Sequence, residues 1–155
     1  MKRLFVLVAA LWMAGIAIAQ DKKIEGLPVS LGDSIEKVKS ALETTLEPEE
    51  SRSAVQRNTK ALRLKTRGIW VFFDQDGRAY NIRLDAPFAG NVGGVQIGNS
   101  RALLVEKLGK PAKVLKDMVM GLNKFEPYLY YIDDRTTVRF DFDRDGEIET
   151  MFVLK

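Results

Sequence analysis

Internal repetition limits the folds open to this chain more than any other feature of its sequence. VSLGDS at 29–34 returns as VQIGNS at 95–100, and IWVFFDQDG at 69–77 returns as VRFDFDRDG at 138–146. Segments repeated in the same order indicate one supersecondary unit used twice. We therefore predict an α+β protein of two tandem repeats, over 24–86 and 95–155, each a helix followed by an antiparallel β-meander.

The N-terminal segment has the composition of a cleavable secretory signal. Lys2 and Arg3 precede an apolar run over 4–18, and Ala17 and Ala19 match a small-residue cleavage site. The run is shorter than the roughly 20 residues that a helix needs to cross a bilayer, so a membrane anchor is the less favoured alternative. The chain has no Cys, which excludes a lipid-modified Cys. We predict a signal peptide over 1–19 and a periplasmic or secreted product without a stable membrane anchor.

Charge and composition indicate a globular domain without a nucleic-acid-binding surface. The chain has 24 basic and 21 acidic residues, and cleavage of the signal removes two of the basic ones. No long block of like charge follows, so the clustered Lys and Arg typical of a nucleic-acid interface are not predicted. Hydrophobic residues make up 46% of the chain, which suffices for a core without disulfides.

In the first half, we predict a helix over 34–46, capped by Asp33 with Glu36 as its capping-box partner. Its buried face is expected to carry Ile35, Val38, Leu42 and Leu46. The turn signals Gly68 and Asp76-Gly77 separate predicted strands, which cover 62–67, 69–73 and 80–84. The polar segment 52–60 is compatible with either a short helix or a loop.

In the second half, Asn99 or Ser100 is expected to cap a helix whose inward residues are Leu104 and Leu108 and whose stop is Gly109 with Pro111. A strand over 113–119 and a turn over 121–124 are possible additions. The meander strands are predicted at 128–132, 137–143 and 147–154. Residues 87–94, rich in Gly, are predicted to form the linker between the repeats.

Catalytic signals are absent from the sequence. The chain contains no His, the commonest general base and metal ligand, and no Cys, so thiol catalysis and most zinc sites are excluded. The spacing of the glycines over 90–98 is not that of a phosphate-binding loop. We predict no enzymatic activity and no cofactor, with a carboxylate-based hydrolase kept as the remaining catalytic alternative.

Asp141-x-Asp143-x-Asp145-Gly146 matches the beginning of a calcium-binding loop. Phe152 occupies the twelfth position, where such a loop needs a bidentate Glu. Asp-Gly is also favoured in tight hairpin turns for its backbone conformation alone. We therefore predict a hairpin turn and no metal site.

The aromatic residues suggest a protein-binding surface. Trp70 and Phe72 occupy positions where the second repeat has Arg139 and Asp141, on the sheet face that alternation assigns to solvent. Cations are expected across the neighbouring strands at Arg63, Lys65 and Arg83. Aromatic and Arg side chains dominate interface hot spots, although the linker or the other repeat could cover this patch instead. A second candidate cluster contains Phe125, Tyr128, Tyr130 and Tyr131, of which alternation must bury some.

The second helix carries a short signature that resembles a known family. Gly98-Asn-Ser100, Leu104 and Leu108-Gly-Lys-Pro111 resemble the helix of small bacterial envelope domains of the β-lactamase-inhibitor-like superfamily. Gly32-Asp-Ser34, with Val38 and Leu42, is similar, but Glu43-Thr-Thr45 replaces the closing Gly-x-Pro. That superfamily includes single-copy outer-membrane assembly lipoproteins and tandem inhibitory proteins.

The resemblance implies a binding protein rather than a catalyst, with a partner held on the joined sheets. The absence of a lipid-bearing Cys argues against the role of the assembly lipoprotein. We predict an exported module that binds a protein partner of the periplasm or envelope, most specifically an inhibitor or immunity-type antagonist of an envelope or secreted enzyme. A non-catalytic envelope accessory factor of the same fold is the alternative.

Overall fold

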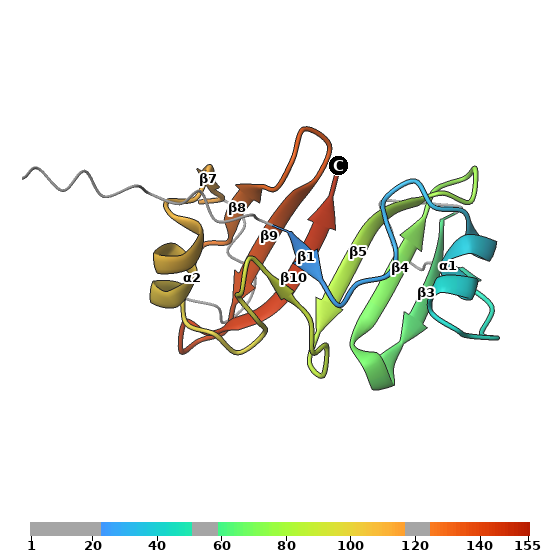
Figure 1. Cartoon of the computed structure of the whole chain (residues 1–155), viewed down its shortest axis with the longest axis horizontal. Helices are drawn as coiled ribbons and strands as arrows, with labels where there is room; N and C mark the ends of the chain where they lie inside the picture. The colour runs from blue at the N-terminus through green and yellow to red at the C-terminus, as the bar shows by residue number, and fades with distance from the viewer. Residues whose placement is uncertain (1–22, 51–58, 117–124) are drawn as a thin grey trace, which may run out of the picture.

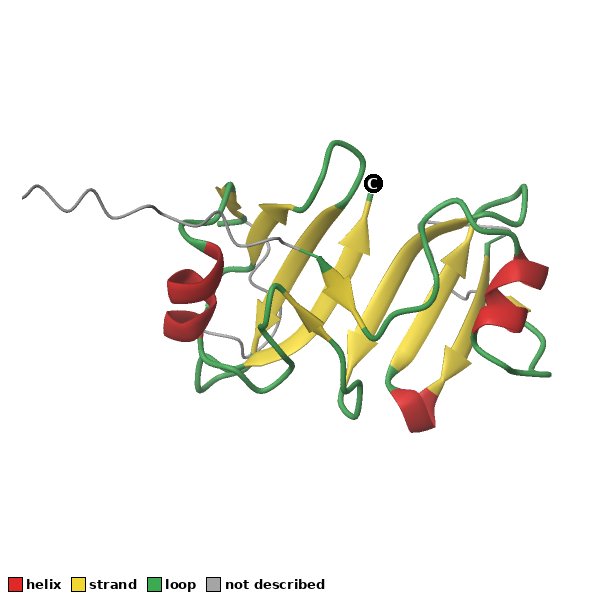
Figure 2. Ribbon diagram, in the orientation of Figure 1, coloured by secondary structure: helices red, strands yellow, loops and turns green. Residues whose placement is uncertain are grey.

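The computed structural model describes residues 23–50, 59–116 and 125–155 and shows an α+β fold with two short helices and antiparallel sheets (Figures 1 and 2). The elements in chain order are β1 (Ile24–Glu25), α1 (Ile35–Ala41), β2 (Glu49–Glu50), β3 (Lys60–Leu64), the 3-10 turn η1 (Lys65–Arg67), β4 (Ile69–Phe73), β5 (Ala79–Asp85), β6 (Asn91–Val92), α2 (Arg101–Leu108), β7 (Lys113–Val114), β8 (Tyr128–Tyr131), β9 (Thr137–Phe142) and β10 (Ile148–Leu154). Among the described helices, none is long and apolar enough to cross a membrane.

One eight-stranded sheet joins the two halves of the chain. Its strand order is β2-β3-β4-β5-β10-β9-β8-β7, so the last long strand of each half meets its counterpart in the middle. There β5 and β10 pair antiparallel, with Ile82 opposite Val153 and Arg83 opposite Phe152. The helices lie at the two ends of this sheet, with β1 and β6 between them (Figure 1).

Alternation along the strands puts the core on one face of the sheet. Ile69, Val71 and Phe73 of β4 are buried, as are Val138, Phe140 and Phe142 of β9. Both helices add to the same hydrophobic cluster, through Val38 and Leu42 of α1 and Leu104 and Leu108 of α2. The residues between the buried ones on each strand therefore lie on the opposite face, which we call the outer face.

Matching backbone contacts anchor the helix of each half to its hairpin. Gly32 N–H donates to Ala79 O over 2.7 Å, and Gly98 N–H donates to Ile148 O over 2.8 Å. Ser34 caps α1 by accepting from Lys37 N–H, and Ser100 caps α2 by accepting from Leu103 N–H. The hairpin aspartates also match, since Asp74 accepts from Asp76 N–H and Asp143 accepts from Asp145 N–H.

The first helix differs from its prediction at both ends. Ser34, not Asp33, is the cap, while Asp33 accepts from Ser30 N–H and Lys37 Nζ. The helix ends at Ala41, because Leu42 leaves the helical conformation and Glu43 has a φ of 48°. Leu46 consequently lies beyond the helix and is exposed, not buried.

The first strand predicted after that helix is shorter than expected. β3 ends at Leu64, and Lys65–Arg67 form η1 instead of continuing the strand. Gly68 follows with a φ of 65°, and a Cβ there would lie 2.0 Å from Asp85 O. This close approach permits only glycine at the tight return into β4. The segment 52–60 belongs mostly to residues 51–58, outside the described residues.

The second half follows its predictions more closely. Ser100 is the cap and Gly109 follows the last helical residue, while β8, β9 and β10 begin or end within one residue of the predicted strands. β7 covers Lys113–Val114, and the rest of the strand predicted to 119, with the turn predicted at 121–124, falls outside the described residues.

The segment predicted as a linker is packed against the rest of the chain. β6 lies within it and pairs with β1, with Val92 opposite Ile24. Phe88 and Val92 are buried in the core cluster, and a Cβ on Gly90 would lie 2.2 Å from Glu25 O. Residues 87–94 therefore form an ordered strap on the core side, so they do not cover the outer face.

Candidate protein-binding face

A continuous row of alternating cations and aromatic rings crosses the middle of the outer face. Cross-strand pairing places Arg63 opposite Trp70, Trp70 opposite Arg83, Arg83 opposite Phe152 and Phe152 opposite Arg139. Directly paired side chains lie on the same face of a sheet. We call these five residues, contributed by β3, β4, β5, β10 and β9, the arginine–aromatic row.

The rings of the row are flanked by guanidinium groups. Arg63 and Arg83 each lie over the Trp70 ring with Cζ 5.2 Å from its centroid. Phe152 lies between Arg83 at 5.9 Å and Arg139 at 4.1 Å. All four contacts are within cation–π range. Trp70 is half-buried with two arginines over its ring, and residues 87–94, one of the two covers considered as alternatives, pack on the core side instead.

Carboxylates along one side of the row fix the arginines. Arg83 Nε donates to Asp85 Oδ1 over 2.9 Å, and Thr150 Oγ1 donates to the same oxygen over 3.0 Å. Arg139 makes two hydrogen bonds to Asp141, over 2.8 and 3.0 Å. Burial raises the pKa of Asp141 above its usual value, although Arg139 and Arg83 oppose that shift. Because both arginines are held, the row is pre-organised.

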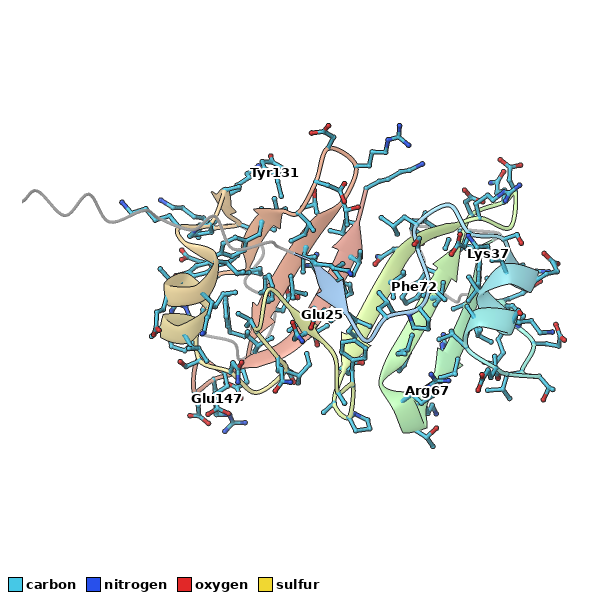
Figure 3. The ribbon with its side chains drawn as sticks, viewed as in Figure 1. Glu25, Lys37, Arg67, Phe72, Tyr131 and Glu147 are labelled. Atoms are coloured by element: carbon cyan, nitrogen blue, oxygen red, sulfur yellow. The ribbon has the colours of Figure 1, made fainter. Side chains whose placement is uncertain are left out.

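The other side of the row is mostly apolar. A second line of cross-strand pairs runs beside the row and contains, in strand order, Phe72, Asn81, Leu154, Thr137 and Tyr131. Tyr131 is 62% exposed, and Phe72 and Leu154 are partly exposed. In Figure 3, Phe72 lies over the half that contains α1, and Tyr131 lies at the upper end of the other half. We call Phe72, Leu154 and Tyr131 the apolar flank, and Asp85, Thr150 and Asp141 the acidic flank.

The structure brings most of the predicted binding residues together, with two corrections. Lys65 lies in η1, so it is not a cross-strand neighbour of Trp70. Tyr130 is 1% exposed and its hydroxyl donates to Gly109 O, because its place in β8 puts it on the core face. It therefore cannot contact a partner.

The second predicted aromatic cluster splits between core and surface. Tyr128 and Phe125 surround the guanidinium of Arg101, with Cζ 4.9 and 4.4 Å from the ring centroids, and Phe142 lies 5.4 Å away. Of the candidate tyrosines, only Tyr131 is exposed. Phe152 and Leu154 were not among the predicted binding residues, although alternation in β10 places both on the outer face.

The predicted hairpin occupies the site of the partial calcium motif. Asp143 Oδ1 accepts from Asp145 N–H and Glu147 N–H, while Asp141 is engaged by Arg139. Within the described ranges, no cluster of three or more potential metal ligands is found.

Comparisons with known proteins identify a similar fold and indicate no activity. No family model matches the sequence, and no curated protein matches it. The structure is similar to a crystal structure of a DUF4309 family protein (YjgB) from Bacillus subtilis, with a TM-score of 0.53 and 17% identity over 84% of this chain and 82% of that one. At this identity the likeness concerns the fold alone.

Proposed function

We propose that this chain is an exported, non-catalytic module that binds another protein through its outer face. The observation that carries the proposal is the arginine–aromatic row. A Trp, a Phe and three Arg gathered in register, beside partly exposed Phe72, Leu154 and Tyr131, have the composition of an interface hot spot. Among the described elements, both helices and the β1–β6 strap contribute to the core cluster on the other face of the sheet.

A protein is a better partner for this row than a sugar or a nucleic acid. Recognition of bases or sugar rings on a sheet uses free aromatic faces for stacking. Here two guanidinium groups lie over the Trp70 ring and two over the Phe152 ring, where they compete with a stacked base or sugar. The carboxylates of the acidic flank also oppose a polyanion. Guanidinium edges and apolar side chains instead suit the carbonyls, carboxylates and hydrophobic side chains of a protein surface.

We also propose that the two halves are tandem copies of one unit, of the β-lactamase-inhibitor-like type. The matched caps and the matched hydrogen bonds from Gly32 to Ala79 and from Gly98 to Ile148 support this. The N-terminal sequence supports export and signal cleavage. Within this proposal, antagonism of an envelope or secreted enzyme is the leading role. An accessory role in the envelope is the alternative. A neighbouring gene for envelope assembly would favour the accessory role, and a neighbouring gene for a hydrolase or toxin would favour antagonism.

Site-specific photo-crosslinking in the native host tests the face. A benzophenone amino acid at Phe72 should cross-link to a discrete protein band, and the same group at Leu46, an exposed position at the end of the sheet, should not. Equal labelling from both positions, or none from Phe72, contradicts the proposal.

The free energy of unfolding of Trp70→Ala shows whether Trp70 serves binding or stability. Because the ring is half-buried by two cations, we expect a loss of about 1–2 kcal/mol in free energy of unfolding, from two cation–π contacts of roughly 0.5–1 kcal/mol each. The same variant should abolish the Phe72 cross-link. A loss of about 3–5 kcal/mol, as for a core aromatic, would assign Trp70 to stability instead.

A further inference from the structure

A second surface feature lies at the β7 end of the sheet, where the arginine–aromatic row ends. Four exposed lysines, spaced three residues apart, extend from the last turn of α2 past β7: Lys107, Lys110, Lys113 and Lys116. No Asp or Glu interrupts 107–116. None of the four forms an ion pair with a described carboxylate. We call these four residues the basic end.

Strand register connects the basic end to the row. Lys113 of β7 is paired with Leu129 of β8, and Leu129 is paired with Arg139 of β9. Lys113 therefore lies on the outer face, in line with Phe152 and Arg83. Arg139 is neutralised by Asp141, so the unpaired positive charge on this side of the row lies at Lys113 and beyond.

The first half of the chain provides an internal control for these lysines. The equivalent connection from α1 to its edge strand carries Glu43, Glu47, Glu49 and Glu50 and no Lys or Arg. Glu47 pairs with Lys39 and Glu49 with Arg63, so this edge is partly neutralised. Since the same edge folds with glutamates in one half, the fold does not require lysines in the other.

We infer that the partner presents an acidic segment that crosses the outer face from Arg83 toward the basic end, with its apolar side chains on Leu154 and Tyr131. This inference rests on the proposed function and adds the chemistry and direction of the partner. Complementary charge steers encounter and fixes orientation more than it adds affinity. The glutamates at the opposite edge disfavour the reverse orientation.

An anionic membrane is the competing occupant for a lysine cluster. The observations favour a protein segment, because Lys113 is in register with a row that also displays Asp85, Asp141 and exposed apolar groups. Carboxylates held on the contact face are repelled by a uniformly anionic surface, whereas a mixed peptide can avoid them.

Selection from a display library of random 12-residue peptides on the purified protein tests the inference. Enriched peptides should combine several Asp or Glu with bulky apolar residues. Binding of the best synthetic peptide, followed by fluorescence anisotropy, should weaken about tenfold or more in Lys110→Glu/Lys113→Glu. The matched control Arg78→Glu/Arg144→Glu changes net charge equally at exposed residues of the two hairpins and should alter binding less than twofold.

The outcomes separate this inference from the proposed function. Enrichment of basic or uncharged peptides that still depend on Trp70 overturns the acidic partner but leaves the binding face intact. Equal losses in both double variants, or no enrichment, also overturn it. Vesicles of anionic phospholipid provide the last arm: binding to them that is lost in Lys110→Glu/Lys113→Glu, without any acidic peptide being selected, assigns the basic end to a membrane.

Discussion

The two halves of the molecule share a backbone scheme and differ almost entirely in what they display on the outer face. Each helix is capped by a Ser and each hairpin turn is held by an Asp. Yet Trp70 and Phe72 in the first half stand where the second half has Arg139 and Asp141. The edges differ in sign as well, with glutamates after α1 and lysines after α2. The two halves therefore match in the backbone contacts of their caps and turns and differ in the side chains of the outer face.

If the halves are structurally equivalent, their core positions should be equally costly to truncate. Phe73 and Phe142 occupy the same place before the hairpin turns and are 0% and 1% exposed. We expect Phe73→Ala and Phe142→Ala each to lower the free energy of unfolding by about 3–5 kcal/mol. Urea titrations measure both. A loss confined to one variant would show that one half contributes most of the stability.

The halves also differ in chemistry at the boundary of the core. Ile35 follows the cap of α1 and lies near Gly77, whereas Arg101 follows the cap of α2 within a cage of three aromatic rings. We expect Ile35→Arg to destabilise by about 2 kcal/mol, because the first half offers no such cage for the charge. Arg101→Ile should cost less, since it removes a charge whose Nε is buried without a hydrogen-bond partner. Thermal unfolding of both variants checks the order, and the reverse order contradicts it.

Alkaline pH should separate the halves through Tyr130, which occupies the place that Leu64 holds in the first half. Burial raises the pKa of Tyr130 to about 12. The phenol of the unfolded chain ionises at about pH 10. The contribution of Tyr130 to the free energy of unfolding is therefore fully present below about pH 10 and is lost as the pH rises toward 12. Tyr130→Phe should lose about 1 kcal/mol at neutral pH with its hydrogen bond, and its stability should fall less between pH 10 and 12. Identical slopes for both proteins would refute this.

The smallest expected effect is that of calcium on the two hairpins. Asp74 and Asp143 both use Oδ1 to accept backbone N–H groups in their own turns. Thermal unfolding with and without millimolar calcium should coincide, because a ligand that binds the native state must raise its stability. An upward shift of several degrees that magnesium does not reproduce, and that Asp141→Asn removes, would establish a metal site in the second half alone.

Sequence patterns predicted the features that depend on neighbouring residues. The alternation in 69–73 and 137–142, the hairpin turns at Asp76-Gly77 and Asp145-Gly146, and the stop at Gly109 are local, and the structure places strands, turns and the helix end there. The choice of Ser34 over Asp33 as cap and the early end of α1 were missed. The early end of α1 involves a contact to another segment, since Arg67 donates to Leu42 O, whereas Asp33 accepts from the nearby Ser30 N–H, a local contact that the capping pattern does not reveal.

Periodicity and residue type suffice to predict the α+β class, the buried face of each long strand and the candidate residues Trp70, Phe72, Arg63 and Arg83. The pairing of β5 with β10 became known from the fold of the whole chain. That pairing brings Arg83 beside Phe152 and builds one row from both halves. It joins strands far apart in the chain, and its register is fixed by the buried pair Ile82 and Val153 rather than by any local preference, since a slip of one residue would turn every core side chain to the outer face.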